Sequence, residues 1–288
     1  MIAARMPTNV VILSVFRPMN HASLFSGIGG FDLAASWLGW NNIFQVEIDE
    51  FCQKVLTKHF PETQRFRDIK QFDGSQFRGA IGVLSGGFPC QPFSCAGKRR
   101  GAEDDRYLWP EMLRVISEIR PRIVIGENVP GIIDMAIEQV CLGLEAENYG
   151  WEIFIIPAAA VNAPHRRDRV WIIAHSGSLR FNAGRAEQSL QGIGEHSEIW
   201  TNPHTKSTKL PMRQTGQRQI KFWGSSPRSF WESRRPEPVI CRVDNGIPNR
   251  VDRIRSLGNA IVPQIAYEIF NIIEEWSNQC QSYPDPRP

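Results

Sequence analysis

The sequence lacks any apolar run close to the roughly 18–20 residues that a helix needs to span a bilayer. It opens with MIAARMPTNVVILSVFRPMN, a short apolar run without the small-residue cleavage pattern of a secretory signal. These absences exclude a membrane-spanning helix and favour the cytoplasm. We expect residues 1–18 to be a disordered leader, or the result of a start assigned too early, with the true start at Met19.

Metal-binding and disulfide patterns are also missing. The cysteines are scattered, with no C-x-x-C pair and no Cys/His cluster of the kind that holds zinc. Without a secretory signal, this scatter indicates a reducing compartment rather than a disulfide framework. We therefore expect no metal and free thiols at Cys52, Cys90, Cys95, Cys141, Cys241 and Cys280.

An internal repeat and an even spread of charge are absent as well. The chain has 288 residues, of which 42% are hydrophobic and 22% charged, as is typical of globular proteins. Residues 176–246 carry eleven Lys and Arg against six Asp and Glu, so this segment holds a charge of +5 within a formal net charge of +3. The concentrated basic excess favours a polyanionic partner.

Short apolar runs alternate with helical patterns through the first 175 residues. This alternation predicts an α/β fold with a doubly wound, mostly parallel sheet and a ligand at the carboxyl ends of its strands. After an irregular segment at 176–246, a helical pattern resumes with Pro263 in its first turn. We expect strands at 22–26, 43–48, 80–85, 122–126, 152–157 and 169–174, and helices at 31–39, 50–59, 109–119 and 132–147.

A glycine-rich string, LFSGIGGFDLAA at 24–35, follows the first expected strand and opens a helix. It is not a clean dinucleotide fingerprint, because Asp32 stands where the third glycine would fall, and alone it fits a turn without a ligand. Glu47, at the end of the next strand, strengthens the binding interpretation, since an acid there can accept both ribose hydroxyls of a nucleoside. Asp68 follows a third short segment, either as an acceptor for an adenine amino group or as a helix cap or turn residue.

Cys90 lies between two prolines in FPCQPF, shortly after the strand expected at 80–85. Pro89 and Pro92 restrict the backbone on either side of it. Cations follow in GKRRG at 97–101, and neighbouring cations favour the thiolate, which is the nucleophilic form. A small buried hydrophobe is the commoner fate of a cysteine, and we keep that interpretation for the other five. The flanking residues favour a catalytic thiol at Cys90.

Glu127 ends another expected strand, in GENVPG, beside the strand that leads to Cys90. A carboxyl group there can exchange a proton with a ring nitrogen of a substrate. The alternative is an acid that caps the helix from about residue 132.

Three arginines enter the last strand in APHRRDRVWIIA at 163–174. Arg167 and Arg169 are two residues apart, so they would share one face of an extended chain. Arg169 can hold a carbonyl oxygen or a phosphate there, whereas such a run is more often a solvated edge.

Six motifs occur in one order: FSGIGG, the acid of VEID, PCQPFS, ENV, RRDR and LGNAIVPQ. In this order the chain resembles the cytosine-C5 DNA methyltransferase family over roughly residues 20–276. The resemblance implies a Rossmann-like methyltransferase fold and S-adenosylmethionine as the methyl donor, with S-adenosylhomocysteine as the product. It also implies a catalytic domain at 19–175, completed by 247–278, and a small, irregular, basic target-recognition domain at 176–246.

The resemblance assigns the site residues as well. Cys90 would attack C6 of a flipped cytosine in double-stranded DNA, while Glu127 engages N3 and Arg169 the O2 carbonyl; Arg167 belongs to the same catalytic motif. The donor would contact Phe25, Gly27, Gly29, Gly30, Glu47, Ile48, Asp68, Ile69, Pro89, Leu108 and Asn259. The DNA would contact Gln91, Ser94, Lys98, Arg99 and Arg100.

A compact enzyme of this kind is typical of bacteria and phages, where it serves restriction–modification or self-protection beside a cognate restriction endonuclease; we expect a monomer. Three alternatives stay open. An RNA cytosine-C5 methyltransferase would share the architecture. A non-catalytic nucleic-acid-binding relative would keep the fold, although the intact Cys90, Glu127, Arg167 and Arg169 argue against it. A nicotinamide-dependent oxidoreductase would explain Glu47 but not PCQPFS.

Overall fold

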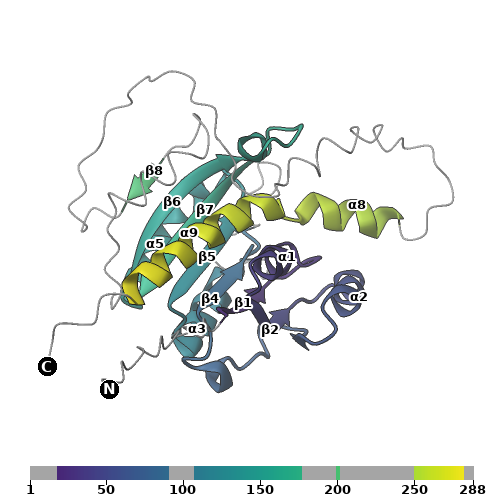
Figure 1. Ribbon diagram of the computed structural model, residues 1–288. Helices are drawn as coiled ribbons and strands as arrows, with labels where there is room; N and C mark the ends of the chain where they lie inside the picture. Colours follow the sequence, from purple (N-terminus) through teal and green to yellow (C-terminus); the bar gives the residue numbers. More distant parts are fainter. Residues whose placement is uncertain (1–17, 91–106, 177–198, 202–249, 282–288) are drawn as a thin grey trace, which may run out of the picture.

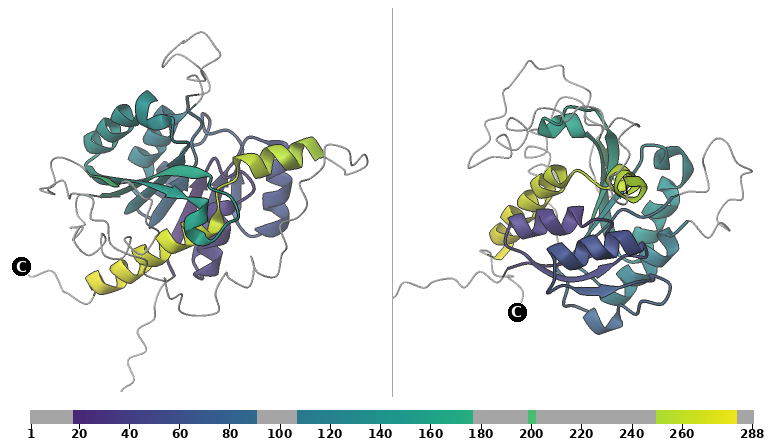
Figure 2. Two further views of the ribbon diagram at one scale, coloured as in Figure 1. Left: turned by 90° about the horizontal axis from the view of Figure 1, so that it is seen from above. Right: turned by 90° about the vertical axis from the view of Figure 1, so that its right-hand side faces the viewer.

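The computed structural model describes residues 18–90, 107–176, 199–201 and 250–281 of the chain. Within these ranges an eight-stranded sheet forms the centre, and helices cover both of its faces (Figures 1 and 2). This arrangement confirms the α/β class that the alternating apolar runs predict. None of the described helices is long and apolar enough to cross a membrane.

The strand order is β3-β2-β1-β4-β5-β7-β6-β8. The first five strands of this order are parallel, and β7 pairs antiparallel with both β5 and β6. The order reverses between β1 and β4, which is where doubly wound sheets bind their ligands. The strands are β1 (Asn20–Leu24), β2 (Asn41–Val46), β3 (Gln64–Phe66), β4 (Val83–Gly86), β5 (Ile123–Asn128), β6 (Tyr149–Pro157), β7 (Asp168–Ser176) and β8 (Ile199–Thr201).

Two strands of the sheet were not among the expected ones. β3 is a three-residue strand that pairs with β2 at the edge of the sheet. β8 lies inside the segment expected as the recognition domain, yet it pairs with β6. Three residues of that segment therefore extend the central sheet, while 177–198 and 202–249 lie outside the described residues.

Two apolar layers cover the sheet because successive strand residues point to opposite faces. Val83 belongs to the layer that α1 (Gly30–Trp37) and α9 (Pro263–Gln281) complete. Its neighbour Leu84 belongs to the layer that α3 (Trp109–Ile119) and α5 (Ile137–Ala146) complete. Phe31 of α1 stacks on Phe270 of α9 in the first layer, and Phe88 meets Trp109 of α3 in the second. Figure 2 shows these helices on the two sides of the sheet.

The expected helices match α2 (Glu50–His59) and α3 (Trp109–Ile119) at both ends, and α1 (Gly30–Trp37) closely. The single helix expected at 132–147 is wrong. Ala136 has a φ of −150°, which no α-helix accommodates, so the chain forms two helices there. The remaining elements are α4 (Ile132–Met135), α5 (Ile137–Ala146), α8 (Arg250–Asn259), α9 (Pro263–Gln281) and the short 3₁₀ helices η1 (Ser75–Phe77) and η3 (Ala158–Val161).

The turn between β1 and α1 depends on Gly29 and Gly30. Gly29 has a φ of 85°, and a Cβ there would lie 2.6 Å from the Phe60 ring. A Cβ on Gly30 would lie 2.6 Å from Cγ1 of Ile261. The absence of both side chains lets α2 and the segment that follows α8 approach the turn closely.

Gly29→Ala therefore combines backbone strain with a collision, and we expect it to lower the free energy of unfolding by about 2–4 kcal/mol. Gly39→Ala is the matched control, because Gly39 has a φ of 73° and nothing lies within 4 Å of the added Cβ. Strain alone should cost about 1–2 kcal/mol there. Urea unfolding of the two variants measures the difference, and equal losses would contradict the collision.

Candidate active site

The predicted site residues meet at the carboxyl edge of the parallel strands. Phe25 follows β1, Glu47 follows β2, and Asp68 lies two residues beyond β3. Cys90 lies four residues beyond β4, and Glu127 is the penultimate residue of the neighbouring strand β5. These five residues therefore lie at the carboxyl edge of the sheet, as the order of the expected strands predicts.

The Cys90 thiol is held by a side chain to which the sequence analysis gave no role. Sγ of Cys90 donates to Oδ1 of Asn128 at 2.7 Å, and Nδ2 of Asn128 donates to the Phe88 carbonyl at 2.8 Å. Oδ1 also accepts the Val129 N–H at 2.9 Å. Asn128 thus joins β5 to Phe88 and to Cys90, the residues on either side of Pro89. Its position beside Glu127 in ENV was the signal that would have found it.

The same segment, residues 88–90, is also tied to the start of α3. Cys90 forms an isolated antiparallel bridge with Tyr107, and the Leu108 N–H donates to the Pro89 carbonyl at 3.2 Å. Phe88 packs against Trp109 at a ring-centroid distance of 5.1 Å. Backbone and aromatic contacts therefore fix the thiol from α3 as well as from β5.

Burial raises the pKa of the Cys90 thiol, and the charge of Glu127 raises it further; hydrogen bonds from its own backbone and to Asn128 lower it. The thiol is therefore protonated at neutral pH in this arrangement. The cations at 97–101, from which the sequence analysis expected thiolate stabilisation, lie outside the described residues.

Glu127 is buried, with 8% of its surface exposed, and its Oε1 lies 3.0 Å from Nε of Arg169. Burial raises the pKa of this carboxyl to about 7, although the Arg169 and Arg167 charges oppose the shift. A group with that pKa can donate or accept a proton near neutrality, as the sequence analysis expected. The capping alternative is wrong, because α4 begins after Gly131 without a side-chain cap.

The two arginines do not share a face of an extended chain, so that expectation is wrong. Arg167 has a φ of 38° and precedes β7, whereas Arg169 lies within β7. The Nη2 of Arg167 donates to the carbonyls of Gly258 and Ala260, each at 2.7 Å. Arg167 thus caps the carboxyl end of α8 on both sides of the exposed Asn259.

Glu47 and the glycine turn form a second cluster on the same edge. Oε2 of Glu47 accepts the Gly27 N–H at 2.7 Å, and Oε1 accepts the Asp49 N–H at 2.8 Å. The Ile48 N–H also bonds to this carboxylate, which has about four acceptor positions and so keeps one for a ligand. Nothing lies within 4 Å of a Cβ built on Gly27. The residue that follows Glu47 in the chain, Ile48, is 63% exposed. An acid, an open glycine turn and an exposed apolar side chain fit a nucleoside.

Asp32 explains the missing third glycine. It is fully buried, burial raises its pKa, and it accepts the Ser23 hydroxyl at 3.0 Å. The Ser23 and Ser26 hydroxyls lie 2.7 Å apart, and Ser26 also reaches the Val46 carbonyl at 3.3 Å. Asp32 therefore supports the turn from inside the core, where a glycine would leave the serines without this acceptor.

The other residues that we expect to contact the methyl donor differ in how far they are exposed to solvent. Asp68 is half-buried and its Oδ1 accepts the Lys70 N–H at 2.9 Å, which confirms the turn interpretation, while the adenine contact stays a prediction. Ile69 is buried in the core, Leu108 is half-buried against it, and Pro89 is exposed. The expected DNA contacts lie outside the described residues: Gln91, Ser94, Lys98, Arg99 and Arg100.

Three thiols of the described side chains are free and buried: Cys52, Cys90 and Cys141. The described residues contain no group of three or more His, Cys, Asp or Glu arranged to hold a metal ion. Cys95 and Cys241 lie outside the described residues, and the side chain of Cys280 is not described.

The profile of the family C-5 cytosine-specific DNA methylase matches residues 19–223. The chain is 34% identical to the type II methyltransferase M.Eco47II of Escherichia coli over 163 residues, which are 54% of this chain and 39% of that protein. It is 32% identical to the type II methyltransferase M.HgiCII of Herpetosiphon aurantiacus over 216 residues, 71% of this chain and 49% of that protein. The chain thus spans less than half the length of these relatives.

A crystal structure of a variant of Spodoptera frugiperda DNMT2 superposes with a TM-score of 0.50 at 23% identity, over 57% of this chain and 52% of that chain. At this identity the likeness concerns the fold, and it agrees with the expected Rossmann-like architecture.

Glu127→Gln should lower the pKa of the Cys90 thiol, because it removes the neighbouring negative charge. We expect faster alkylation of Cys90 by iodoacetamide at about pH 8, where only a small thiolate fraction reacts. Peptide mass spectrometry resolves each site, and Cys52, whose pKa burial raises to about 11, is the internal control. An unchanged rate at Cys90 would show that the Glu127 charge does not act on the thiol.

Proposed function

Because the chain belongs to the C-5 cytosine-specific DNA methylase family, we propose that it transfers a methyl group from S-adenosylmethionine to C5 of cytosine in double-stranded DNA. The observation that carries the proposal is the meeting of three groups at one sheet edge. Cys90 lies four residues beyond β4, Glu127 lies near the end of the neighbouring parallel strand β5, and Arg169 pairs with Glu127 at 3.0 Å.

These residues match the chemistry that cytosine requires. Cytosine C5 is a poor nucleophile. The Cys90 thiol therefore gives its proton to solvent, and the resulting thiolate adds to C6 and shifts electron density toward C5. Glu127 donates its proton to N3, and Arg169 holds the O2 carbonyl as negative charge develops. S-adenosylmethionine supplies an electrophilic sulfonium methyl when bound. Loss of the C5 proton to solvent, return of the N3 proton to Glu127 and expulsion of Cys90 as the thiolate then restore the aromatic ring, with the methyl group on C5.

Cytosine must leave the base stack to reach this site, because the thiol lies among buried groups. Asn128 holds the Cys90 sulfur before the base arrives, and Gly87 lets the loop pass close to Glu127: a Cβ there would lie 3.2 Å from Oε2. The thiol and the carboxyl group are near enough for the Glu127 charge to raise the pKa of Cys90.

The donor would lie along the carboxyl ends of β1, β2 and β3. Glu47 would accept the ribose hydroxyls and Asp68 the adenine amino group, while the backbone from Phe25 to Gly30 would border the methionine portion. Ile48, Ile69, Pro89, Leu108 and Asn259 would complete the site. Arg167 would hold Asn259 in place at this site, because it binds the carbonyls of the two residues that flank Asn259.

We assign residues 19–175 and 247–278 to the catalytic unit and 176–246 to target recognition. The packing of α9 on α1 supports the first assignment, and the basic excess of 176–246 supports the second. Restriction–modification or phage self-protection beside a cognate endonuclease would follow from this activity, in a monomeric cytoplasmic enzyme.

Methyl transfer from radiolabelled S-adenosylmethionine tests the proposal directly. We expect incorporation into duplex genomic DNA and none into tRNA, and bisulfite sequencing of the product would locate the target site. Cys90→Ser should reduce incorporation to background while binding S-adenosylhomocysteine with the affinity of the wild type. Incorporation into tRNA alone would favour the RNA alternative, and full activity of Cys90→Ser would overturn the covalent scheme.

The pKa of Glu127, about 7, makes a second prediction. Glu127 carries the proton for N3 only below that pH, so its contribution falls as pH rises through about 7. Each single-turnover rate is first divided by the Cys90 thiolate fraction that alkylation gives for that variant at the same pH. The ratio of these corrected rates, wild type over Glu127→Gln, should fall about tenfold per pH unit above the pKa. A ratio that stays constant between about pH 6 and 9 would rule out Glu127 as the proton donor.

A further inference from the structure

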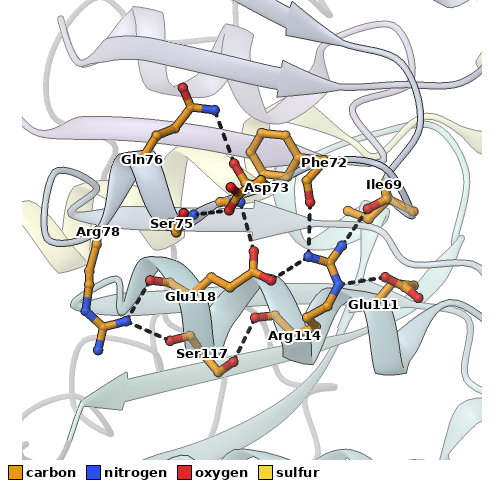
Figure 3. A network of polar contacts seen from close by, with 11 residues as sticks. Ile69, Phe72, Asp73, Ser75, Gln76, Arg78, Glu111, Arg114, Ser117 and Glu118 are labelled. Atoms are coloured by element: carbon orange, nitrogen blue, oxygen red, sulfur yellow. Dashed lines mark hydrogen bonds and ion pairs between the residues drawn. The ribbon is translucent and has the colours of Figure 1, made fainter.

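Arg114 of α3 binds the loop that follows Asp68 (Figure 3). Its Nη2 donates to the Ile69 carbonyl at 2.6 Å, and its Nη1 donates to the Phe72 carbonyl at 3.0 Å. Two carbonyls of one loop thus point to a single guanidinium from a helix more than 40 residues further along the chain.

Two carboxylates of the same helix hold the guanidinium. Nε lies 2.9 Å from Oε2 of Glu111, and Nη1 lies 2.6 Å from Oε1 of Glu118. These partners lie three residues before and four residues after Arg114, so all three share one face of α3. The planar fork is therefore fixed before it meets the loop, which a lysine ammonium at the same place would not reproduce.

One peptide group connects Arg114 to Asp68. The carbonyl of Ile69 and the N–H of Lys70 belong to the same planar peptide, and they point in opposite directions. Arg114 takes the carbonyl at 2.6 Å, and Oδ1 of Asp68 takes the N–H at 2.9 Å. The orientation of this peptide plane therefore sets the direction of the Asp68 carboxylate.

The far end of the loop is tied to the same helix through other groups. Oε2 of Glu118 accepts the Gly74 N–H at 2.8 Å, and Nη1 of Arg78 donates to the carbonyls of Ser117 and Glu118 at 3.2 and 2.9 Å (Figure 3). These contacts do not involve the peptide that Asp68 accepts. Arg78, which follows η1, thus also donates to two backbone carbonyls, here those of α3, but it has no contact with the peptide that binds Asp68.

We propose that Arg114 is a positioning residue for the adenine end of the donor site, which aims the Asp68 carboxylate at the 6-amino group by fixing the Ile69–Lys70 peptide. The proposal rests on the proposed function, because it takes S-adenosylmethionine as the ligand. A purely structural arginine would weaken the binding of every donor analogue equally, whereas a residue that aims Asp68 affects recognition of the 6-amino group alone.

The test compares S-adenosylhomocysteine with S-inosylhomocysteine, which carries an oxo group in place of the 6-amino group. Calorimetry gives both dissociation constants for the wild type, Arg114→Lys and the matched control Arg78→Gln. We expect the wild type to prefer the adenosyl compound, and we expect Arg114→Lys to lose about fivefold of that preference, the equivalent of one hydrogen bond. Arg78→Gln should retain the full preference.

Asp68→Asn completes a double-mutant cycle. In that background Arg114→Lys should no longer change the preference, because the group that it aims has been replaced. Arg114→Gln, which keeps one amide donor, replaces Arg114→Lys in the cycle if circular dichroism shows that the lysine variant does not fold.

An unchanged preference in the Arg114 variant, or an equal loss in Arg78→Gln, overturns the proposal. A wild type that binds both compounds equally also overturns it, since Asp68 then does not read the amino group. That outcome leaves the proposed methyl transfer standing, because incorporation of the labelled methyl group into DNA is measured separately. A wild type that binds neither compound and methylates no DNA removes both proposals.

Discussion

The parallel pairing of β4 with β5 is the constraint on which the site depends. Their register sets Gly86 opposite Gly126, so the chain leaves β4 beside Glu127 and returns over Asn128. A slip of one residue would turn the Glu127 side chain to the opposite face of the sheet. The close approach requires Gly87, since a Cβ there would lie 3.2 Å from a carboxylate oxygen. Two short strands thus bring the Cys90 thiol and the Glu127 carboxyl together.

Burial then gives these groups their chemistry. The pKa values of Cys90, Glu127 and Glu47 are all raised, and in each case burial is the largest cause. A thiol that stays protonated is protected from oxidation until the site is assembled, since the thiolate is the reactive form. A carboxyl with a pKa of about 7 carries a proton that an exposed glutamate would lose. Burial removes the hydration that would stabilise the charged forms, and the protonated forms therefore persist at neutral pH to a greater extent than in water.

Much of this arrangement could be read from the sequence, and the failures have physical reasons. The bounds of α3 follow from a strong apolar period, and the placement of Cys90 beside Glu127 follows from strand order. The positive φ of Arg167 could not be predicted, because no glycine or asparagine marks it. The role of Arg114 could not be predicted either, since its partners are backbone carbonyls, which every residue carries.

The helix that completes one face of the sheet is made long after the face itself. Trp40 donates to Glu274 at 3.2 Å across a separation of 234 residues, and Phe31 stacks on Phe270. During synthesis, the apolar residues of α1 and of the strands beneath it emerge without this cover. The fold therefore has contacts of high sequence separation, which form slowly and leave apolar surface exposed to aggregation on the ribosome. The glycine turn, which also packs against Ile261, reaches its final form only when the distant segment arrives.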